Sequence, residues 1–232
     1  MPDFVVFSDF DGTITQQDTG NIIIDHAIGT AKRTELDDSI LEGVRSYRDA
    51  NNEMWAGVSL ATFDEAIALL RAAGVAHDTQ FARFHAILQK HGKTLKVVSA
   101  GLKPIVSLYM ASFANCEIYA NGCEIVLSEH GSTQWRLQYV DDSPFGHDKG
   151  APIRKLKEEF KAAGLSDQDR PRILFIGDGV SDLSAAVDAD VVFAKRGKDL
   201  ETYCAREGIQ GVVAWDDFGV ICDWLEKFLV AT

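Results

Sequence analysis

Two pairs of acidic residues follow apolar runs in widely separated parts of the sequence. Asp9 and Asp11 lie in the run Asp-Phe-Asp-Gly-Thr, and Asp178 and Asp182 lie in the run Gly-Asp-Gly-Val-Ser-Asp. Either run alone is also typical of a turn or a helix cap. If the fold brings the two runs together, four carboxylates share one small region, and like charges there require a compensating cation. Because oxygen ligands suit Mg²⁺, the pattern predicts a magnesium site.

Two further positions have the chemistry of a phosphate site. Ser99 and Gly101 follow an apolar run and precede an expected helix, where a hydroxyl and free backbone N–H groups suit a phosphate oxygen. Lys149 begins an expected helix at residues 149–163, although the helix dipole disfavours a cation at that end. A serine at a helix start is often only an N-cap, and a lysine is usually a solvated charge. The placement of Lys149 nevertheless indicates a specific anionic partner.

Short apolar runs alternate with helical patterns, and this alternation would position the polar residues. Runs rich in β-branched and aromatic residues are typical of strands buried on both faces of a parallel sheet. They occupy residues 4–7, 95–98, 173–176 and 191–194. The alternation predicts an α/β fold with a parallel sheet. Ligands bind beyond the carboxyl ends of the strands in such sheets, so the loops at Asp9, Ser99 and Asp178 should converge on one crevice.

The segments between these strands carry two further expectations. Residues 16–93 show apolar residues at helical spacing, and we expect several helices there. Residues 116–140 show short β patterns, and Asn121-Gly122 is typical of a hairpin turn between two of them.

The composition excludes several classes of protein. The 232 residues carry a net charge of −12, which argues against nucleic acid or an anionic membrane surface as the main partner. The four cysteines form no CxxC pair, so we expect no zinc knuckle and a reducing compartment. No stretch approaches the roughly 20 apolar residues of a membrane span, and the sequence shows no signal peptide. We therefore expect a cytoplasmic protein.

The polar elements together resemble the motifs of the haloacid dehalogenase (HAD) superfamily of phosphatases. They occur along the chain in the superfamily's order, as Asp9-Phe10-Asp11-Gly12-Thr13, Ser99, Lys149 and Gly177-Asp178 through Asp182. The resemblance implies a Rossmann-like α/β core at residues 1–15 and 94–232, with a helical cap inserted at residues 16–93. That insert resembles the cap of the phosphoserine-phosphatase-like branch, which closes over small substrates. A small phosphomonoester is therefore the implied partner.

The resemblance also implies the roles of the first two acids. Asp9 would be the nucleophile that attacks phosphorus and forms an aspartyl-phosphate. Asp11 would protonate the leaving alkoxide and then deprotonate the hydrolytic water. The dehalogenases of this superfamily lack the second acid, so Asp11 favours hydrolysis of a phosphate ester.

The remaining motif residues would hold the metal and the phosphoryl group. Mg²⁺ would be bound by Asp9, the backbone carbonyl of Asp11, and Asp178. Asp182 would bind a metal-bound water or orient Lys149. The residues implied to bind phosphoryl oxygens are Ser99, Gly101 and Lys149.

Two positions of the cap bear on the substrate. Asp18 lies nine positions after Asp9, where phosphoserine phosphatases have a glutamate that binds the amino group. Asn52 aligns with their carboxylate-binding arginine, and an amide cannot replace a bidentate guanidinium. The sequence around Arg48 looks more like the methionine-salvage enolase-product phosphatases and their eukaryotic polyol-phosphate phosphatase relatives. We therefore favour a polyol or sugar phosphate, with Asp18 and Arg48 as substrate residues of the cap.

Several alternatives stay open from the sequence. The chain could act on phosphoserine or on a methylthio-pentenyl phosphate, could transfer phosphate to another alcohol, or could be a catalytically silent protein that binds a phosphometabolite. The sequence leaves the oligomeric state and the pathway undetermined. It also leaves open whether Arg48, His147, Lys195 and Arg196 reach the site.

Overall fold

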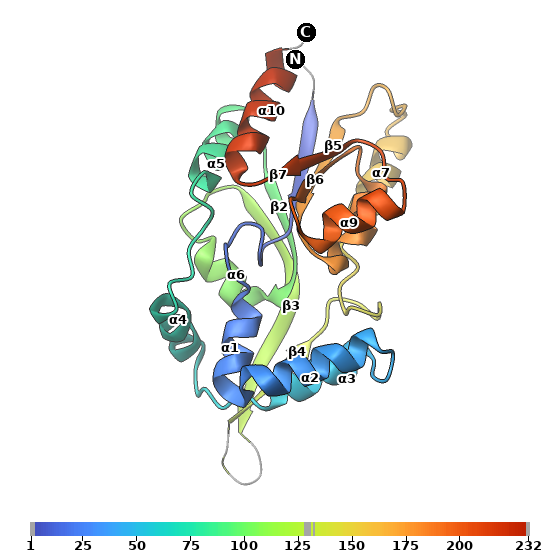
Figure 1. The fold of residues 1–232 in the computed structure, drawn as a ribbon. Coiled ribbons are helices and arrows are strands. Elements are labelled where there is room, and N and C mark those ends of the chain that lie inside the picture. The colour runs from blue at the N-terminus through green and yellow to red at the C-terminus, as the bar shows by residue number, and fades with distance from the viewer. Residues whose placement is uncertain (1–2, 128–130, 132, 231–232) are drawn as a thin grey trace.

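The computed structural model of the chain describes residues 3–127, 131 and 133–230, and it is built around one seven-stranded sheet (Figure 1). The strand order is β4-β3-β2-β1-β5-β6-β7, and each neighbouring pair is parallel except β3 with β4. The strands are β1 Phe4–Ser8, β2 Leu95–Leu102, β3 Cys116–Leu127, β4 Thr133–Gln138, β5 Arg172–Gly177, β6 Val191–Lys195 and β7 Val212–Trp215. The α/β fold expected from the sequence is confirmed.

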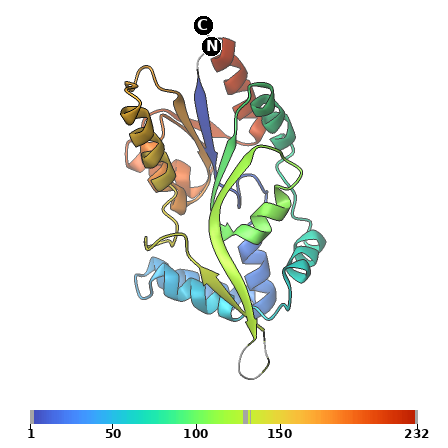
Figure 2. The same ribbon diagram turned by 180° about the vertical axis from the view of Figure 1, so that it is seen from behind.

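Helices cover both faces of the sheet, which explains why its central strands are apolar. They are α1 Thr19–Ile28, α2 Thr30–Leu41, α3 Tyr47–Ala56, α4 Phe63–Ala72, α5 Phe81–Lys90, α6 Lys103–Tyr109, α7 Ala151–Ala162, α8 Leu183–Asp188, α9 Asp199–Arg206 and α10 Phe218–Val230. In β1, Phe4 and Val6 pack in one cluster with α5 and α10. Phe7 points to the opposite face, as alternation along a strand requires, and packs with α7, α8 and α9 (Figure 2).

A separate apolar cluster holds the first four helices together. It joins α1, α2, α3 and α4 to the end of β2, to α6 and to Trp135 of β4. The rings of Trp55 and Trp135 stack with their centroids 5.7 Å apart. Helix α5 packs instead with α10 against the sheet. Helices α1, α2 and α3 lie beyond the carboxyl ends of the central strands (Figure 1). The boundaries of a cap at residues 16–93 stay a prediction.

The hairpin turn expected at Asn121-Gly122 is wrong, because β3 runs without a break through these residues. The first part of β3 pairs with β2 and the second part pairs with β4. Asn121 is buried between them: its amide donates to the Ala100 carbonyl at 2.8 Å, and its carbonyl accepts from the Val140 N–H at 3.0 Å. These two bonds satisfy the side chain inside a strand, so the dipeptide does not form a turn.

None of the helices in the described ranges is both long enough and apolar enough to cross a lipid bilayer.

Candidate active site

The first acidic loop starts where β1 leaves the sheet. Asp9 is 5% exposed, and its N–H donates to the Ile176 carbonyl of β5 at 2.8 Å, which fixes its position beside that strand. Gly12 has φ of 73°, in the left-handed region that glycine adopts without strain. A Cβ at Gly12 would also lie 2.4 Å from the Asp178 carboxylate. The glycine therefore lets the first acidic loop approach the second.

The second acidic loop is organised by Asp182, which is fully buried. Its Oδ2 accepts the backbone N–H groups of Asp178 at 2.9 Å and Gly179 at 3.0 Å. Its Oδ1 accepts the Lys149 ammonium at 2.6 Å. Since both carboxylate oxygens are already engaged, Asp182 is better suited to orient Lys149 than to bind a metal directly.

Lys149 joins the two loops from the turn that precedes α7. Its side chain is 1% exposed, and its Nζ lies 2.8 Å from Oδ1 of Asp9 and 2.6 Å from Oδ1 of Asp182. Burial alone would lower the pKa of Lys149, but the two carboxylates outweigh it and raise the pKa above its ordinary value. The ammonium is therefore a fixed positive charge at the carboxyl end of β1.

One buried cation leaves an excess of negative charge among Asp9, Asp178 and Asp182, which with Lys149 we call the carboxylate cluster. One carboxylate oxygen from each acid lies within 4.8 Å of the others. Burial, together with repulsion from Asp182, raises the pKa of Asp9 well above its usual range and that of Asp178 to about 6. A divalent cation with oxygen ligands would relieve this repulsion, and the carboxylate oxygens of Asp9 and Asp178 suit Mg²⁺.

Asp11 faces a different environment from its neighbour Asp9. Its Oδ1 accepts the backbone N–H of Thr19 at 2.8 Å and the Thr19 hydroxyl at 2.7 Å. Desolvation by the surrounding protein, followed by repulsion from Asp18, raises the pKa of Asp11 to about 7. A carboxyl group with a pKa near neutrality both donates and accepts a proton readily, as a general acid and base must.

The expected phosphate site lies at an irregular end of β2. Ser99 is buried, and its hydroxyl accepts the Gly101 N–H at 3.0 Å. The pairing of β2 with β3 shifts between Ser99 and Leu102, which turns the backbone away from the regular ladder. A ring nitrogen of His147 lies 2.9 Å from the Ser99 carbonyl and holds this irregular segment from behind.

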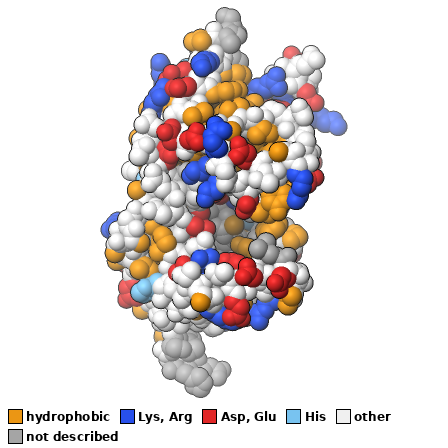
Figure 3. Space-filling model, in the orientation of Figure 1, with side chains coloured by type: hydrophobic (Ala, Val, Ile, Leu, Met, Phe, Trp, Pro, Cys, Tyr) orange, Lys and Arg blue, Asp and Glu red, His pale blue; other side chains and the backbone are white. Residues whose placement is uncertain are grey.

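The motif residues meet in one cavity of about 470 Å³ between the sheet and helices α1, α2 and α3. Figure 3 shows the surface hollowed between the part formed by α9 and the part formed by α2 and α3. The expected site residues that line the cavity are Asp9, Asp11, Asp18, Ser99, Gly101, Lys149 and Asp178. Asp182 lies behind them, where it binds Lys149.

Arg48 does not line this cavity. Its guanidinium donates to the Asp141 and Ser143 carbonyls, and its Cζ lies 4.4 Å from the centre of the Tyr139 ring. Arg48 therefore fastens α3 to the loop that leads to Lys149. A role in binding substrate, as the sequence suggested, has no geometric support.

The other residues left open by the sequence also have definite places. Lys195 donates to the Gly12 carbonyl at 2.6 Å and so supports the first acidic loop. Arg196 pairs with Asp216 on the surface. Sequence reasoning missed Asp37 and Tyr47, which line the cavity from α2 and α3. Neither belongs to a motif, and only the packing of the helices brings them to the site.

The fold and the site together define a class of protein. The sequence pattern of the haloacid dehalogenase-like hydrolases matches residues 6–186, which is more than half of the chain. The chain therefore belongs to the haloacid dehalogenase-like hydrolase family.

Individual relatives narrow this class. Pdp3-interacting factor 1 of Schizosaccharomyces pombe is 39% identical over 208 residues, covering 88% of this chain and 87% of the relative. Polyol phosphate phosphatase PYP1 of Saccharomyces cerevisiae is 35% identical over 212 residues, covering 88% and 86%. A 2-hydroxy-3-keto-5-methylthiopentenyl-1-phosphate phosphatase of Bacillus cytotoxicus is 28% identical over 191 residues, covering 82% of each. The family and these relatives identify the chain as a phosphatase.

Solved structures agree with this assignment at the level of the fold. A phosphoserine phosphatase carrying a phospho-aspartyl intermediate analogue superposes with a TM-score of 0.68 at 15% identity, covering 97% of this chain and 99% of that one. The HAD fold class expected from the sequence is confirmed, including its resemblance to the phosphoserine-phosphatase-like branch.

Proposed function

We propose that the protein is a Mg²⁺-dependent phosphatase that hydrolyses the phosphomonoester of a small polyol or sugar through an aspartyl-phosphate. The observation that carries this proposal is the convergence of Asp9, Asp11, Lys149 and Asp178 on one cavity, with Asp182 behind Lys149. The relative named as a polyol phosphate phosphatase supports the substrate class. The cytoplasmic location expected from the sequence stays a prediction.

The first half of the reaction uses Asp9 and Asp11. A carboxylate oxygen of Asp9 attacks phosphorus, the bond from phosphorus to the leaving oxygen breaks, and Asp11 gives its proton to that oxygen. Oδ1 of Asp9 is already bonded to the Phe10 N–H and to Lys149, so Oδ2 is the atom free to attack. The free alcohol leaves.

The second half regenerates the enzyme. Water attacks phosphorus, the bond from phosphorus to Asp9 breaks, and Asp11 takes the proton that the water loses. Inorganic phosphate is released and Asp9 is again a carboxylate. A pKa of about 7 lets Asp11 act in both halves.

The remaining residues stabilise the charge that develops on the phosphoryl oxygens. Lys149, Ser99 and Gly101 line the cavity together with Asp9. Asp9 and Asp178 are the side chains best placed to hold Mg²⁺, which when bound would neutralise charge on the transferring group. Asp182 holds the Lys149 ammonium in place through a hydrogen bond of 2.6 Å.

The direct test measures phosphate release from a panel of phosphomonoesters with and without Mg²⁺. The panel includes polyol phosphates, sugar phosphates, phosphoserine and p-nitrophenyl phosphate. We expect metal-dependent release that is highest for a polyol or sugar phosphate and is lost in Asp9→Asn. The matched control is Asp38→Asn, because Asp38 is an exposed carboxylate on α2 outside the cavity. Release that persists in Asp9→Asn would contradict the covalent mechanism.

A methylthio-pentenyl phosphate is the second candidate substrate. Met54 and Trp55 line the cavity and offer an apolar surface that suits a thioether. Phosphoserine has less support, because Arg48 binds the loop backbone and Asn52 accepts the Tyr139 hydroxyl at 3.0 Å. Adding acceptor alcohols to the assay separates hydrolysis from phosphate transfer. A silent binding protein would release no phosphate from any ester.

A further inference from the structure

Segment 16–93, which includes α1, α2 and α3, forms one wall of the cavity, and this wall is acidic. The polar residues that segment 16–93 contributes to it include Gln16, Asp18, Asn21, Asp37, Tyr47 and Asn51. Asp18 and Asp37 are the charged members of that set. Within the described part of the chain, the cations that line the cavity are Lys149 and Lys198, which come from the sheet side. A leaving group bound against α1, α2 and α3 therefore meets two carboxylates, and Arg33, which pairs with Asp37 at 2.8 Å, lies behind the wall and does not line the cavity.

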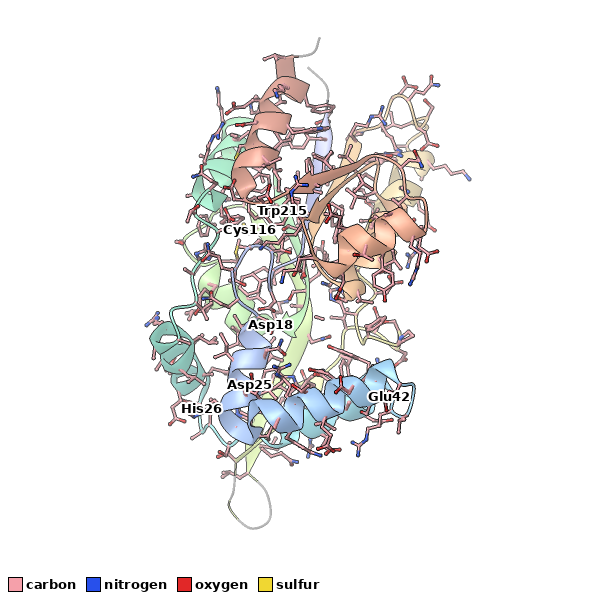
Figure 4. All side chains as sticks on the ribbon, in the orientation of Figure 1. Asp18, Asp25, His26, Glu42, Cys116 and Trp215 are labelled. Carbon is pink, nitrogen blue, oxygen red and sulfur yellow. The ribbon has the colours of Figure 1, made fainter. Side chains whose placement is uncertain are left out.

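The polar atoms of this wall keep hydrogen-bonding capacity free for a ligand. Asp18 lies at the end of α1 that faces the sheet, whereas Asp25 and His26 lie farther along the helix (Figure 4). Oδ1 of Asp18 accepts the Asn21 N–H at 2.8 Å, and Oδ2 of Asp37 accepts Arg33 at 2.8 Å. The second oxygen of each carboxylate has no protein partner among the described residues.

Tyr47 supplies a donor to complement these acceptors. Burial raises the pKa of its hydroxyl above the usual range, so the O–H stays protonated at any physiological pH. Within residues 3–127, 131 and 133–230 its hydroxyl has no hydrogen-bond partner, although the ring packs on Phe145 with centroids 5.4 Å apart. A donor and several acceptors spread over one concave wall suit a chain of hydroxyl groups, each of which both donates and accepts.

We propose that Asp37 and Tyr47, together with Asp18, determine specificity by binding the hydroxyl groups of an uncharged leaving group and rejecting leaving groups that carry a second anion. This inference rests on the proposed phosphatase function and adds residues to it. A carboxylate or second phosphate placed against this wall loses its water without gaining a cation, and it is repelled by two acidic side chains.

The test compares pairs of substrates that differ by one anionic group. Glycerol 1-phosphate is paired with 3-phosphoglycerate, and sorbitol 6-phosphate with 6-phosphogluconate. In each pair a carboxylate replaces a CH₂OH group. Two like charges a few ångströms from the added carboxylate predict a preference in kcat/KM on the order of 100-fold for the polyol member. Equal kcat/KM within the pairs would overturn the proposal.

Two variants assign the preference to named residues. Asp37→Asn keeps an acceptor for Arg33 but removes one charge, and it should narrow the preference about tenfold by improving the anionic member. Tyr47→Phe should lower kcat/KM for the polyol member roughly two- to tenfold. The control Asp38→Asn removes the same charge from α2 outside the cavity and should leave the preference unchanged. If Asp37→Asn and Asp38→Asn change the preference for the polyol member by the same factor, the charge of Asp37 in the cavity wall does not determine specificity.

A binding measurement separates failure of this inference from failure of the proposed function. The leaving group of p-nitrophenyl phosphate has no hydroxyl for the wall to bind. If the wild-type protein releases no phosphate from this ester or from the polyol esters, the phosphatase function itself is rejected. Calorimetric titration of Asp9→Asn with glycerol 1-phosphate and 3-phosphoglycerate tests the wall without turnover, and we expect the polyol ester to bind more tightly. Tighter binding of phosphoethanolamine than of glycerol 1-phosphate would show that the wall selects a cation and would also overturn the proposal.

Discussion

The two ends of the sheet each carry a buried cation paired with carboxylates, and the two pairs affect pKa values in opposite directions. At the carboxyl ends of the strands, Lys149 contacts Asp9 and Asp182, and Asp178 lies close to both acids. The pKa values of Asp9 and Asp178 are raised there. At the amino ends of β5 and β6, Arg170 binds Asp190 through two bonds of 2.6 and 2.8 Å. Burial would raise the pKa of Asp190, but hydrogen bonds from Arg170 and from the Ile173 N–H outweigh it and lower the pKa.

The difference shows how charge balance separates a stabilising site from a reactive one. Arg170 also binds the exposed carboxylate of Asp167 at 2.8 Å, and both oxygens of Asp190 are engaged by Arg170 and the Ile173 N–H. This site therefore stabilises the fold and leaves neither oxygen of Asp190 free for a ligand. The carboxylate cluster has one cation for the buried Asp9 and Asp182 and the half-buried Asp178, so the fold carries a repulsion that a metal ion would relieve. Each cation contacts two carboxylates, and the sites differ in how far those acids are removed from water. The Asp9 and Asp182 side chains beside Lys149 are 8% and 0% exposed, whereas Asp167, the second acid beside Arg170, is 91% exposed.

The largest effect should come from removing the only buried cation of the carboxylate cluster. Lys149→Met leaves Asp9 and Asp182 buried without their partner, which should cost about 3–5 kcal/mol in the free energy of unfolding. It should also lower kcat on the order of 1,000-fold, because the charge that faces the phosphoryl oxygens is lost. Urea unfolding and steady-state assays measure the two effects, with the exposed Lys155→Met as control. An unchanged unfolding free energy would show that the cluster is not strained by its excess charge.

Mg²⁺ should stabilise the folded protein by binding the carboxylate cluster, and this gain should not depend on Asp190 at the other end of the sheet. Mg²⁺ at 100 times its dissociation constant should raise the free energy of unfolding by about 2.7 kcal/mol, because it binds the folded state alone. Thermal denaturation with Mg²⁺ and with a chelator measures this gain. Asp178→Asn should abolish it and Asp190→Asn should retain it. A gain of equal size in both variants would place the metal elsewhere.

The Arg170–Asp190 pair should be needed for stability and not for turnover. Asp190→Asn weakens two charged hydrogen bonds and should lower the free energy of unfolding by about 2 kcal/mol, with kcat/KM unchanged at a temperature where the protein is folded. Denaturant titration beside a phosphatase assay measures both. A drop in kcat/KM of more than a few fold would show that the amino ends of the strands influence the site.

The pH dependence of that loss gives a sharper form of the same prediction. The pKa of Asp190 is lowered in the folded state, so its stabilising contribution is present above the unfolded pKa of roughly 4 and is lost as pH falls through the folded pKa. The gap in stability between wild type and Asp190→Asn should therefore be largest near neutral pH and shrink in acid. A gap that widens as pH falls from about 5 would have the wrong sign.

The smallest effect should come from Lys195, which supports the first acidic loop from outside the cluster. Lys195→Met removes the bond to the Gly12 carbonyl and should raise the Mg²⁺ concentration for half-maximal activity by roughly two- to fivefold. Lys195→Arg should restore most of the metal affinity, since it keeps a cationic donor. Calorimetric titration with Mg²⁺ measures the metal affinity directly, without substrate turnover. If Lys195→Met and Lys195→Arg have the same Mg²⁺ affinity, the Lys195 ammonium does not position the first acidic loop.

The residues that the sequence predicted well are those fixed by strand order. Asp9, Ser99 and Asp178 each follow a buried apolar run, and a parallel sheet brings the carboxyl ends of such runs to one edge. Asp37 and Tyr47 could not be predicted in this way, because their position depends on how α2 and α3 pack over that edge. Arg48 was misplaced for the same reason: the packing of α3 turns its side chain toward the loop that leads to Lys149.

The strand pattern alone was also insufficient at Asn121-Gly122. This pair is a strong local signal for a turn, but the signal reflects backbone preference and omits what the side chain can bind. Here the Asn121 amide meets the Ala100 carbonyl and the Val140 N–H, and these tertiary bonds favour the extended conformation. Such bonds come from segments 20 or so residues away and leave no trace in the local pattern.

The unbroken course of β3 has a consequence for cooperativity. Twelve residues of strand span about 40 Å, and the same strand is hydrogen-bonded to β2 at one end and to β4 at the other. Since Trp135 of β4 belongs to the cluster that holds α1 to α4, melting those helices would leave half of β3 without its partner. The helical region and the sheet should therefore unfold together in a single calorimetric transition, although the family resemblance divides the chain into a core and an inserted cap.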